Sequence, residues 1–439
     1  MVSMDTREGG GRGGHSGYSG NSSGRGRGGR GFSNSNGWQN TNSYPQNTSY
    51  APRGRGRFGG RGGRGGGRGY GANAAPDVEF VSDLRGHRRK VTCLAVDYAN
   101  SQLLSGSHDG TVRVWDCTSG QCVHTQEVGG EVDSMLVEHG WLFVGVKTRE
   151  GRGEVKGWAL GGAHAGIVGH APPGTEVRLE GHTGQVTSLA MGNGMLFSGG
   201  QDKSIRVWKP SAATPVNVNV NVNGNGNGNS QHQFECAAVL EQQNADGHRS
   251  SISCMTVAGP ILFSGDTSGT IKVWDLQSGS IKQTLIKAHR NAQYPAITQL
   301  LIWEGHLMSG SLDGAVKIFE PGTDGTNMVN PACIFTHPEE MHSSGGTSGG
   351  RGRGRNYHTN NNNGVLAMQG VADLDGKAVL MVSYNTEQCI KLYELPTFAD
   401  RGTLTHVNNP RAMASFPQAQ LLFAGDETGK VKCWKWKAK

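Results

Sequence analysis

The stretch LRGHRRKVTCLAVDYANSQLLSGSHDGTVRVWDCTSGQCV, residues 84–123, decides the fold. Three short runs in it are rich in β-branched residues and are separated by turn-forming residues, a pattern that predicts β-strands: VTCLAV, QLLSGS and TVRVWD. Asp109-Gly110, between the second and third runs, is typical of a tight turn. In the last run Val112 and Val114 flank Arg113, so we expect the arginine to face away from the apolar side. The stretch therefore predicts one small antiparallel sheet.

The same pattern recurs along the chain. Clear copies occupy residues 179–210, 245–281 and 286–321, and weaker copies lie within 135–160, 379–396 and 414–436. A small sheet with two apolar faces cannot bury both alone, so neighbouring units must stack, and a ring closes the stack. The conspicuous strand of each unit ends in an aromatic residue, which gives seven units: Trp115, Trp158, Trp208, Trp274, Phe319, Tyr393 and Trp434.

These Gly-His…Trp-Asp units resemble WD repeats, clearly in the first, third, fourth and fifth units and weakly in the others. Seven such repeats imply an all-β fold, a seven-bladed WD-repeat β-propeller over residues 77–439. Closing the ring needs a strand from the other end of the chain. We predict that the segment 79–84 (EFVSDL), which precedes the first unit, forms the outer strand of the blade built from residues 411–436.

Three further segments narrow the resemblance: CVHTQEV (122–128), LYELPTFADRG (392–402) and LLFAGDETGKVKCW (421–434). They are similar to segments of plant proteins that pair an N-terminal CCCH zinc finger with WD repeats. This chain departs from that pattern because no cysteine precedes Cys93. Residues 1–92 therefore cannot supply the thiolates of such a finger, and we do not expect zinc-dependent RNA binding from them.

Residues 1–76 differ in composition from the rest of the chain. They hold 24 of the 71 glycines, eleven arginines and no Lys, Leu or Ile. With Asp5 and Glu8 as the only acids, this segment carries a charge of +9, whereas residues 77–439 carry −2. It lacks the aliphatic side chains that would offset the entropy of ordering a backbone, about 1–2 kcal/mol per residue. We therefore predict a disordered Arg/Gly-rich tail.

The tail combines Arg-Gly and Arg-Gly-Gly steps with scattered aromatic residues. Arginine meets phosphate bidentately and stacks on bases, and aromatic rings stack on unpaired bases. This pattern predicts RNA binding with little base specificity; the alternative is a basic linker that only aids solubility. The residues expected to contact RNA are Arg12, Arg25, Arg27, Arg30, Arg53, Arg55, Arg57, Arg61, Arg64, Arg68 and Tyr70.

A set of polar residues looks catalytic because it contains serine, histidine and aspartate. It occurs twice at matching positions, whereas an enzyme needs one nucleophile, so we interpret it as structural. The resemblance implies a buried hydrogen-bonded chain from indole through hydroxyl and imidazole to the turn aspartate. In the fourth unit Ser268 stands in place of the aspartate, in the fifth Phe319 replaces the tryptophan, and in the seventh Thr428 takes the aspartate position. The two complete sets are His87, Ser105, Asp109 and Trp115, and His182, Ser198, Asp202 and Trp208.

The resemblance also implies a partner-binding face, because such propellers bind partners over one rim of the ring. Residues just after the Gly-His step and beside the turn aspartate are expected there. Their basic bias suggests an acidic peptide or a nucleic-acid backbone; the alternative is that they are ordinary solvated loop residues. The candidates are Arg88, Arg89, Lys203, Arg249, Arg290 and Tyr294.

Two insertions of low complexity interrupt the repeats, at 211–233 and 338–364. Runs of Asn and Gly in both predict irregular surface loops. The second alternates Arg351, Arg353 and Arg355 with glycine next to Tyr357, which raises the hypothesis of a second RNA-contacting arm.

The cysteines give no sign of a metal site. None forms a CxxC pair, Cys117, Cys122 and His124 fit no zinc-finger spacing, and Cys93 and Cys254 occupy matching inward positions of two strands. We expect no cofactor, no metal and no small-molecule substrate. Reduced thiols and the lack of an apolar N-terminal signal favour the nucleus or the cytoplasm. The sequence contains no run of 18 apolar residues, so we expect no membrane-spanning helix.

Together these observations predict a non-enzymatic scaffold whose propeller binds other proteins and whose tail binds RNA. The main alternative is a substrate receptor of a cullin-type ubiquitin ligase. WD-repeat receptors of that class share an arginine two residues after Trp-Asp. This chain has Thr118 and Gln277 at those positions, which weakens the alternative. A propeller enzyme is a third possibility, but no isolated carboxylate pair supports it.

Overall fold

The computed structural model describes residues 75–160, 176–211, 234–240, 247–286, 288–289, 295–322, 329–338 and 363–438. The expected tail and most of both expected insertions lie outside these residues and stay predictions. Ala75 and Pro76, which the sequence placed in the tail, belong to the propeller. The Ala75 N–H donates to the carbonyl of Thr403 (3.0 Å), and Lys437 Nζ donates to the carbonyl of Pro76 (3.0 Å).

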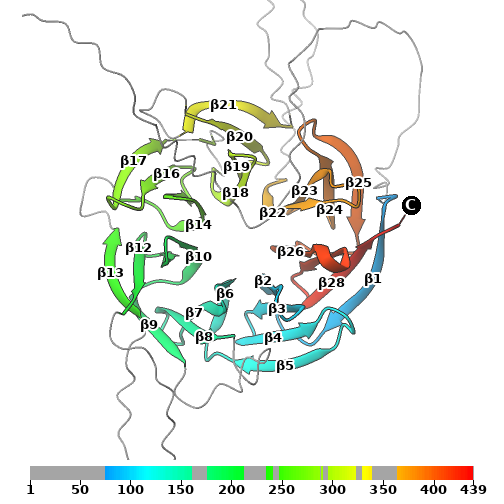
Figure 1. Cartoon of the computed structure of the whole chain (residues 1–439), viewed down its shortest axis with the longest axis horizontal. Helices are drawn as coiled ribbons and strands as arrows, with labels where there is room; N and C mark the ends of the chain where they lie inside the picture. The colour runs from blue at the N-terminus through cyan, green and yellow to red at the C-terminus, as the bar shows by residue number, and fades with distance from the viewer. Residues whose placement is uncertain are drawn as a thin grey trace, which may run out of the picture. The chain divides into compact units, whose positions relative to one another are not determined.

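Seven four-stranded antiparallel sheets are arranged in a ring, which confirms the predicted seven-bladed propeller (Figure 1). The first strand of each blade lies innermost, and each of these inner strands contacts the inner strands of both neighbouring blades all the way around. No helix in the described part of the chain is long and apolar enough to cross a bilayer.

The first four blades are listed from their inner to their outer strand. Blade one holds β2 (Val91–Asp97), β3 (Gln102–Ser107), β4 (Thr111–Asp116) and β5 (Cys122–Glu127). Blade two holds β6 (Glu131–Glu138), β7 (Trp141–Lys147), β8 (Gly153–Ala159) and β9 (Val177–His182). Blade three holds β10 (Val186–Gly192), β11 (Met195–Gly200), β12 (Ile205–Pro210) and β13 (Phe234–Leu240). Blade four holds β14 (Ile252–Ala258), β15 (Ile261–Asp266), β16 (Ile271–Asp275) and β17 (Ser280–Leu285).

The last three blades follow the same order. Blade five holds β18 (Ile297–Trp303), β19 (His306–Ser311), β20 (Val316–Pro321) and β21 (Val329–His337). Blade six holds β22 (Val365–Ala372), β23 (Ala378–Tyr384), β24 (Cys389–Glu394) and β25 (Ala399–Thr405). Blade seven holds β26 (Ala412–Phe416), β27 (Leu421–Gly425), β28 (Lys430–Trp436) and, from the other end of the chain, β1 (Val78–Arg85), with the short 3-10 helix η1 (Pro417–Ala419) between β26 and β27.

Strand β1 closes the ring, as the sequence predicted. It pairs antiparallel with β28, from Val78 opposite Trp436 to Arg85 opposite Lys430 (Figure 1). The observed strand extends the predicted segment by one residue at each end. Leu84 of β1 is buried in the apolar layer between blades seven and one, so the closing strand packs as well as pairs.

Adjacent blades interlock at a glycine near the end of the second strand. A Cβ built on Gly106 would lie 2.6 Å from Cγ1 of Val132, the branched residue at the start of the inner strand of blade two. Such a distance is too short for any real side chain, so the hydrogen of glycine is what admits the neighbouring blade. Five other blades make the equivalent contact between a glycine and a branched residue of the next blade. The pairs are Gly145 with Val186, Gly199 with Ile252, Gly265 with Ile297, Gly310 with Val365, and Gly425 with Val91.

Hydroxyl groups reinforce these contacts between blades. The Thr92 hydroxyl donates to the carbonyl of Val132 in the next blade (2.6 Å), and Thr187, Ser253 and Thr298 make the equivalent bonds. Blade six has Ser383 where its neighbours have the interlocking glycine, and its hydroxyl donates to the carbonyl of Pro410 in blade seven (2.7 Å). Packing and hydrogen bonding therefore fix each blade against the next at the same place.

We predict that Gly106→Ala lowers the free energy of unfolding by about 1–3 kcal/mol, because the added methyl group forces the Val132 side chain out of its place. Gly370→Ala is the matched control: Gly370 also lies in a strand, but a Cβ built on it meets nothing within 4 Å. Urea unfolding of both variants checks this. Equal losses of stability would contradict the interlocking role of Gly106.

Candidate functional site

One end of the ring carries the turn between the second and third strands of each blade and the link that enters each inner strand. We call this end the turn face. Backbone hydrogen bonds join turn and link within a blade: His108 N–H donates to the Lys90 carbonyl (3.2 Å), and the same bond runs from Gln201 to Gln185 and from Thr267 to Ser251. The turn face therefore has a fixed backbone in which the Gly-His residues and the turn aspartate lie side by side.

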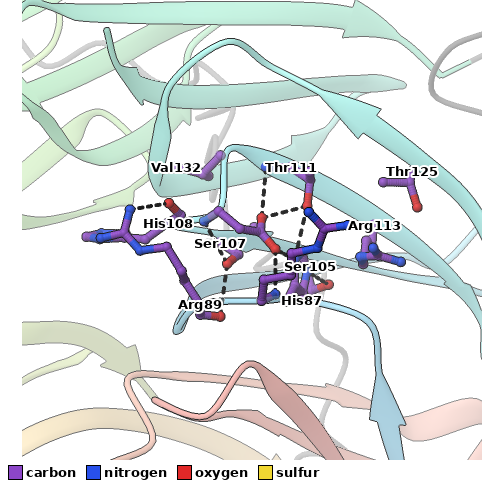
Figure 2. A network of polar contacts seen from close by, with 12 residues as sticks. His87, Arg89, Ser105, Ser107, His108, Thr111, Arg113, Thr125 and Val132 are labelled. Carbon is purple, nitrogen blue, oxygen red and sulfur yellow. Dashed lines mark hydrogen bonds and ion pairs between the residues drawn. The ribbon is translucent and has the colours of Figure 1, made fainter. Parts of the chain in front are cut away.

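In blade one a chain of hydrogen bonds runs from the core to this face, and Figure 2 shows its His87 and Ser105 side chains. The Trp115 indole N–H donates to Ser105 Oγ (2.8 Å). Ser105 Oγ lies 2.8 Å from His87 Nε2, and His87 Nδ1 lies 3.0 Å from Asp109 Oδ2. The Arg88 backbone N–H donates to the same carboxylate oxygen (2.9 Å), which fixes the link against the turn.

The positions of the protons in this hydrogen-bonded network follow from its two ends, the indole of Trp115 and the carboxylate of Asp109. An ionised carboxylate can only accept, so His87 Nδ1 carries the proton and Nε2 accepts from the Ser105 hydroxyl. Burial by itself would raise the pKa of Asp109, but hydrogen bonds from His87, Thr111 and the Arg88 backbone hold it well below its usual value. The Ser105 hydroxyl and both ring nitrogens of His87 are therefore engaged in hydrogen bonds within the blade.

Blade three repeats this arrangement, and blade five keeps most of it. In blade three the Trp208 indole donates to Ser198 Oγ (2.8 Å), which lies 2.8 Å from His182 Nε2, and His182 Nδ1 is 2.8 Å from Asp202 Oδ2. In blade five His289 bridges Ser309 Oγ (2.7 Å) and both Asp313 oxygens (3.0 Å). As the sequence predicted, Phe319 replaces the tryptophan there, so Ser309 has no indole donor.

Blades four and seven correct the sequence-based expectation. Blade four does not lose its carboxylate: Asp266, two residues before Ser268, places Oδ2 2.8 Å from His248 Nδ1. Ser268 donates its backbone N–H and its hydroxyl to the other oxygen of Asp266. Asp266 can contact His248 because its side chain lies at the end of β15, where it is almost completely buried.

In blade seven Thr428 likewise does not stand in for the aspartate. Asp426 occupies the position of Asp266 and accepts hydrogen bonds from the backbone N–H and the hydroxyl of Thr428 (2.8 and 2.6 Å) and from the Lys430 N–H (3.2 Å). Each of these carboxylates therefore shapes a turn, with or without a histidine partner.

Arg113 faces away from the buried Val112 and Val114, as the sequence predicted. Its guanidinium packs against the Gly-His link, because a Cβ on Gly86 would lie 2.8 Å from the guanidinium carbon of Arg113. Arg206 does the same at Gly181 in blade three. The lack of a side chain at Gly86 and Gly181 therefore makes room for these two arginines.

The predicted partner-binding residues lie on the turn face where the structure describes them. Arg88, Lys203 and Arg249 are exposed, and none forms an ion pair with another described residue. Arg89 is also exposed, but its guanidinium pairs with Glu131 (2.6 Å). Arg290, Tyr294 and all eleven tail residues lie outside the described residues, so their roles stay predictions.

Sequence reasoning missed two cations on the same face. Arg149 and Arg152 are exposed in the turn between β7 and β8, which the hydrogen bonds Thr148 N–H to Arg152 C=O (2.9 Å) and Gly151 N–H to Thr148 C=O (3.0 Å) hold in shape. Blade two is a weak copy of the repeat without the Gly-His signal, so nothing drew attention to its turn. The length of this turn, KTREGRG, was the available sign.

The two cysteines that the sequence placed inside strands are packed side chains. Cys93 and Cys254 are buried in apolar layers between blades, and burial raises the pKa of each thiol to about 12. Cys117 is half-buried and Cys122 is exposed. Among the described residues no group of three His, Cys, Asp or Glu side chains is placed to hold a metal ion.

Comparison with known proteins identifies the repeats. The family model "WD domain, G-beta repeat" matches residues 78–116, 174–209 and 235–275. The chain is 31% identical over 359 residues to "Zinc finger CCCH domain-containing protein 17" of Oryza sativa subsp. japonica, covering 82% of this chain and 66% of that protein. The chain thus spans about two thirds of the length of this relative.

Two solved structures share the fold. The WD40 propeller domain of Doa1 superposes with a TM-score of 0.56 at 18% identity, covering 82% of this chain and 97% of that one. The RRP9 WD40 repeats superpose with a TM-score of 0.57 at 17% identity, covering 83% and 99%. At such identities the likeness establishes the architecture and says nothing of function.

We predict that Asp266→Ala lowers the free energy of unfolding by about 1–3 kcal/mol, because it leaves His248 without its buried partner. Ser268→Ala, at the position that the repeat pattern assigns to the carboxylate, should cost clearly less, because the backbone N–H of residue 268 still donates to Asp266. Chemical denaturation of the two variants separates the structural assignment from the sequence-based one. A larger loss in Ser268→Ala would refute the role of Asp266.

We also predict that the contribution of Asp202 depends on pH. Burial would raise the pKa of Asp202, but hydrogen bonds from His182 and Ser204 lower it to about 2, below the unfolded value of about 3.9. The stabilisation is therefore present above about pH 4 and is lost as the pH falls through about 2. Unfolding of the wild type and Asp202→Asn from about pH 6 to about pH 2.5 should show their stabilities converging on acidification. A constant difference would contradict the ionised state.

Proposed function

We propose that this chain, a WD-repeat propeller protein homologous over its repeats to plant CCCH zinc-finger proteins, is an adaptor. Its propeller binds other proteins, and its Arg/Gly-rich tail binds RNA. One observation carries the proposal for the propeller: the buried Ser-His-Asp groups of blades one, three, four and five are engaged in holding the turn face in shape, while Arg88, Arg149, Arg152, Lys203 and Arg249 on that face form no ion pair with another described residue. Such a face suits binding better than chemistry.

The entry of the chain into the propeller supports a separate role for the tail. Strand β1 begins at Val78, opposite Trp436, and ends at Arg85, next to the Gly-His link of blade one. The chain therefore enters blade seven at the end away from the turn face. RNA bound to the tail and a protein bound to the turn face can then be held together without competing for one surface.

The proposal places the protein in RNA-associated complexes of the nucleus or the cytoplasm and assigns it no catalytic activity. Proteins that co-purify with the chain distinguish it from the ubiquitin-ligase alternative. RNA and ribonucleoproteins would support the adaptor, and ligase adaptor subunits would support the alternative.

We predict that removing residues 1–74 weakens binding of single-stranded RNA at least tenfold and flattens its salt dependence. The reason is that the tail arginines are the groups expected to displace counterions from the RNA phosphates. The deletion ends before Ala75 so that the closing strand and its contact with Thr403 are kept. Fluorescence anisotropy with a labelled oligouridine over a salt series measures both effects.

Two controls make this test specific. A full-length variant with the ten tail arginines assigned to RNA replaced by serine keeps the length of the chain and should lose affinity equally. Circular dichroism and thermal unfolding should be unchanged in both variants. Undiminished RNA binding by the shortened chain would end the proposal for the tail.

A further inference from the structure

We propose that the exposed cations on blades one to four form a continuous docking track for an acidic peptide segment of a partner protein. The track consists of Arg88, Arg149, Arg152, Lys203 and Arg249, and we call it the cationic arc. This inference rests on the proposed adaptor function and names the chemistry of its partner. It concerns one side of the turn face rather than its whole circumference.

The cations of the arc are available to a partner. All five side chains are exposed, and none is in ion-pair contact with a carboxylate among the described residues. This separates them from Arg89, whose charge is already matched by Glu131, and from His108, which lies against Asp133 (2.7 Å) with only 11% of its side chain exposed. The arc therefore leaves out Arg89 and His108, and each of its five cations is free of an ion pair with a described carboxylate.

The acids on the same side of the face are mostly engaged. The Asp109 and Asp202 side chains are 8% and 9% exposed and lie beneath hydrogen-bond donors from their own blades. The pKa of Glu131 is lowered chiefly by its hydrogen bond to Arg89, so it remains ionised as part of that pair. An approaching partner therefore meets the cations at the surface together with three exposed carboxylates, Glu150 beside Arg149 and Glu127 and Glu180 near the ends of the outer strands β5 and β9.

Contacts between blades make the arc continuous. A Cβ on Gly153, at the end of the Arg149–Arg152 turn, would collide with the carbonyl of Gly184 in the link of blade three. The Ser251 hydroxyl of blade four donates to the carbonyl of Gln201 (3.1 Å), two residues before Lys203. The turns that carry the cations are thus packed against neighbouring links, so the cations are held on a fixed frame.

Blades six and seven present different chemistry on the same face. Their turns surround an open hollow of about 470 Å³ lined by amide, hydroxyl and one carboxylate side chains: Asn385, Thr386, Gln388, Asn408, Asn409, Glu427 and Thr428. This hollow adjoins the start of the arc, because a Cβ on Gly429 would lie 2.8 Å from the carbonyl of Arg89. Amides and hydroxyls donate to and accept from peptide groups equally well, so a chain leaving the arc can continue there.

Two features favour an acidic peptide over RNA for the arc. Single-stranded RNA binding relies on aromatic platforms for the bases. The exposed aromatic side chains among the described residues are Phe80 on the outer strand β1 and Tyr98 in the β2–β3 turn at the opposite end of the blade. In addition, the proposed function already assigns RNA to a separate basic segment of the chain, the tail with its charge of +9.

The test compares two full-length triple variants that lose the same charge. Arg149→Ser/Lys203→Ser/Arg249→Ser removes charge from the arc, and Lys209→Ser/Lys282→Ser/Lys435→Ser removes it from exposed positions on third and outer strands. The tail is identical in both, so its own attraction for anions cancels. The probes are a labelled peptide of alternating Asp/Glu and Gly/Ser, its Lys-substituted counterpart and an oligouridine, followed by anisotropy over a salt series.

We expect the arc triple to weaken acidic-peptide binding about tenfold and to flatten its salt dependence, because charges at a binding surface act through long-range attraction. The outer triple should change it less than twofold, the basic peptide should not bind, and RNA should bind both triples alike. Equal weakening of the acidic peptide by both triples would overturn the arc. A loss of RNA rather than peptide binding in the arc triple would make the arc an RNA track instead.

The outcome is separable from that of the proposed function. Loss of RNA binding on tail deletion together with equal peptide affinities of the two triples would leave the RNA-binding tail standing and remove only the arc. Thermal unfolding of the triples should match the wild type, because none of the substituted side chains is buried.

Discussion

The structure depends on the close approach of neighbouring blades at the end of the second strand. There a glycine receives the branched side chain that starts the next inner strand, as Gly106 receives Val132 and Gly425 receives Val91. The last of these pairs joins blade seven to blade one, so the ring closes by the same contact that repeats around it, and β1 adds its pairing with β28 on the outside. Blade six, with Ser383 in place of the glycine, replaces packing by a hydrogen bond to Pro410. A propeller of this kind is one interlocked unit because no blade buries its own faces.

The buried polar chains serve that same end. Trp115, Ser105, His87 and Asp109 are satisfied among themselves, and the carboxylate also holds the backbone of the link that leads into the inner strand. A buried group without a partner would cost about 1–3 kcal/mol, which explains why each of the buried histidines His87, His182, His248 and His289 has both a serine and a carboxylate beside it. Blade four shows the rule at its limit, since Asp266 supplies from a different position the carboxylate that His248 needs. The resemblance to a catalytic triad is therefore a result of what a buried histidine requires.

The repeated pattern made the fold predictable, and the features that the sequence analysis missed lie where a blade departs from that pattern. Seven aromatic strand ends and the leading segment 79–84 were enough to predict the number of blades and the closing strand. The position of the carboxylate in blade four was not predictable, because an alignment by spacing cannot see that Asp266 points inward from a strand end. Arg149 and Arg152 were missed because blade two lacks the Gly-His signal that located the other turns. Ion pairing was equally invisible in the sequence, where Arg88 and Arg89 are indistinguishable, whereas in the fold Glu131 neutralises only the second.

This difference between neighbours shows how a repeat scaffold acquires function. The positions that interlock blades or satisfy buried groups serve the fold wherever they are kept, so a residue there says little about binding. The exposed turn positions carry no such constraint, and on them the copies diverge, with cations on blades one to four and amides on blades six and seven. The asymmetry of the turn face cannot come from folding, because the strands beneath it are equivalent. It is carried by the surface charges that remain once the internal pairs are set aside, and on these the proposed acidic partner of the arc rests.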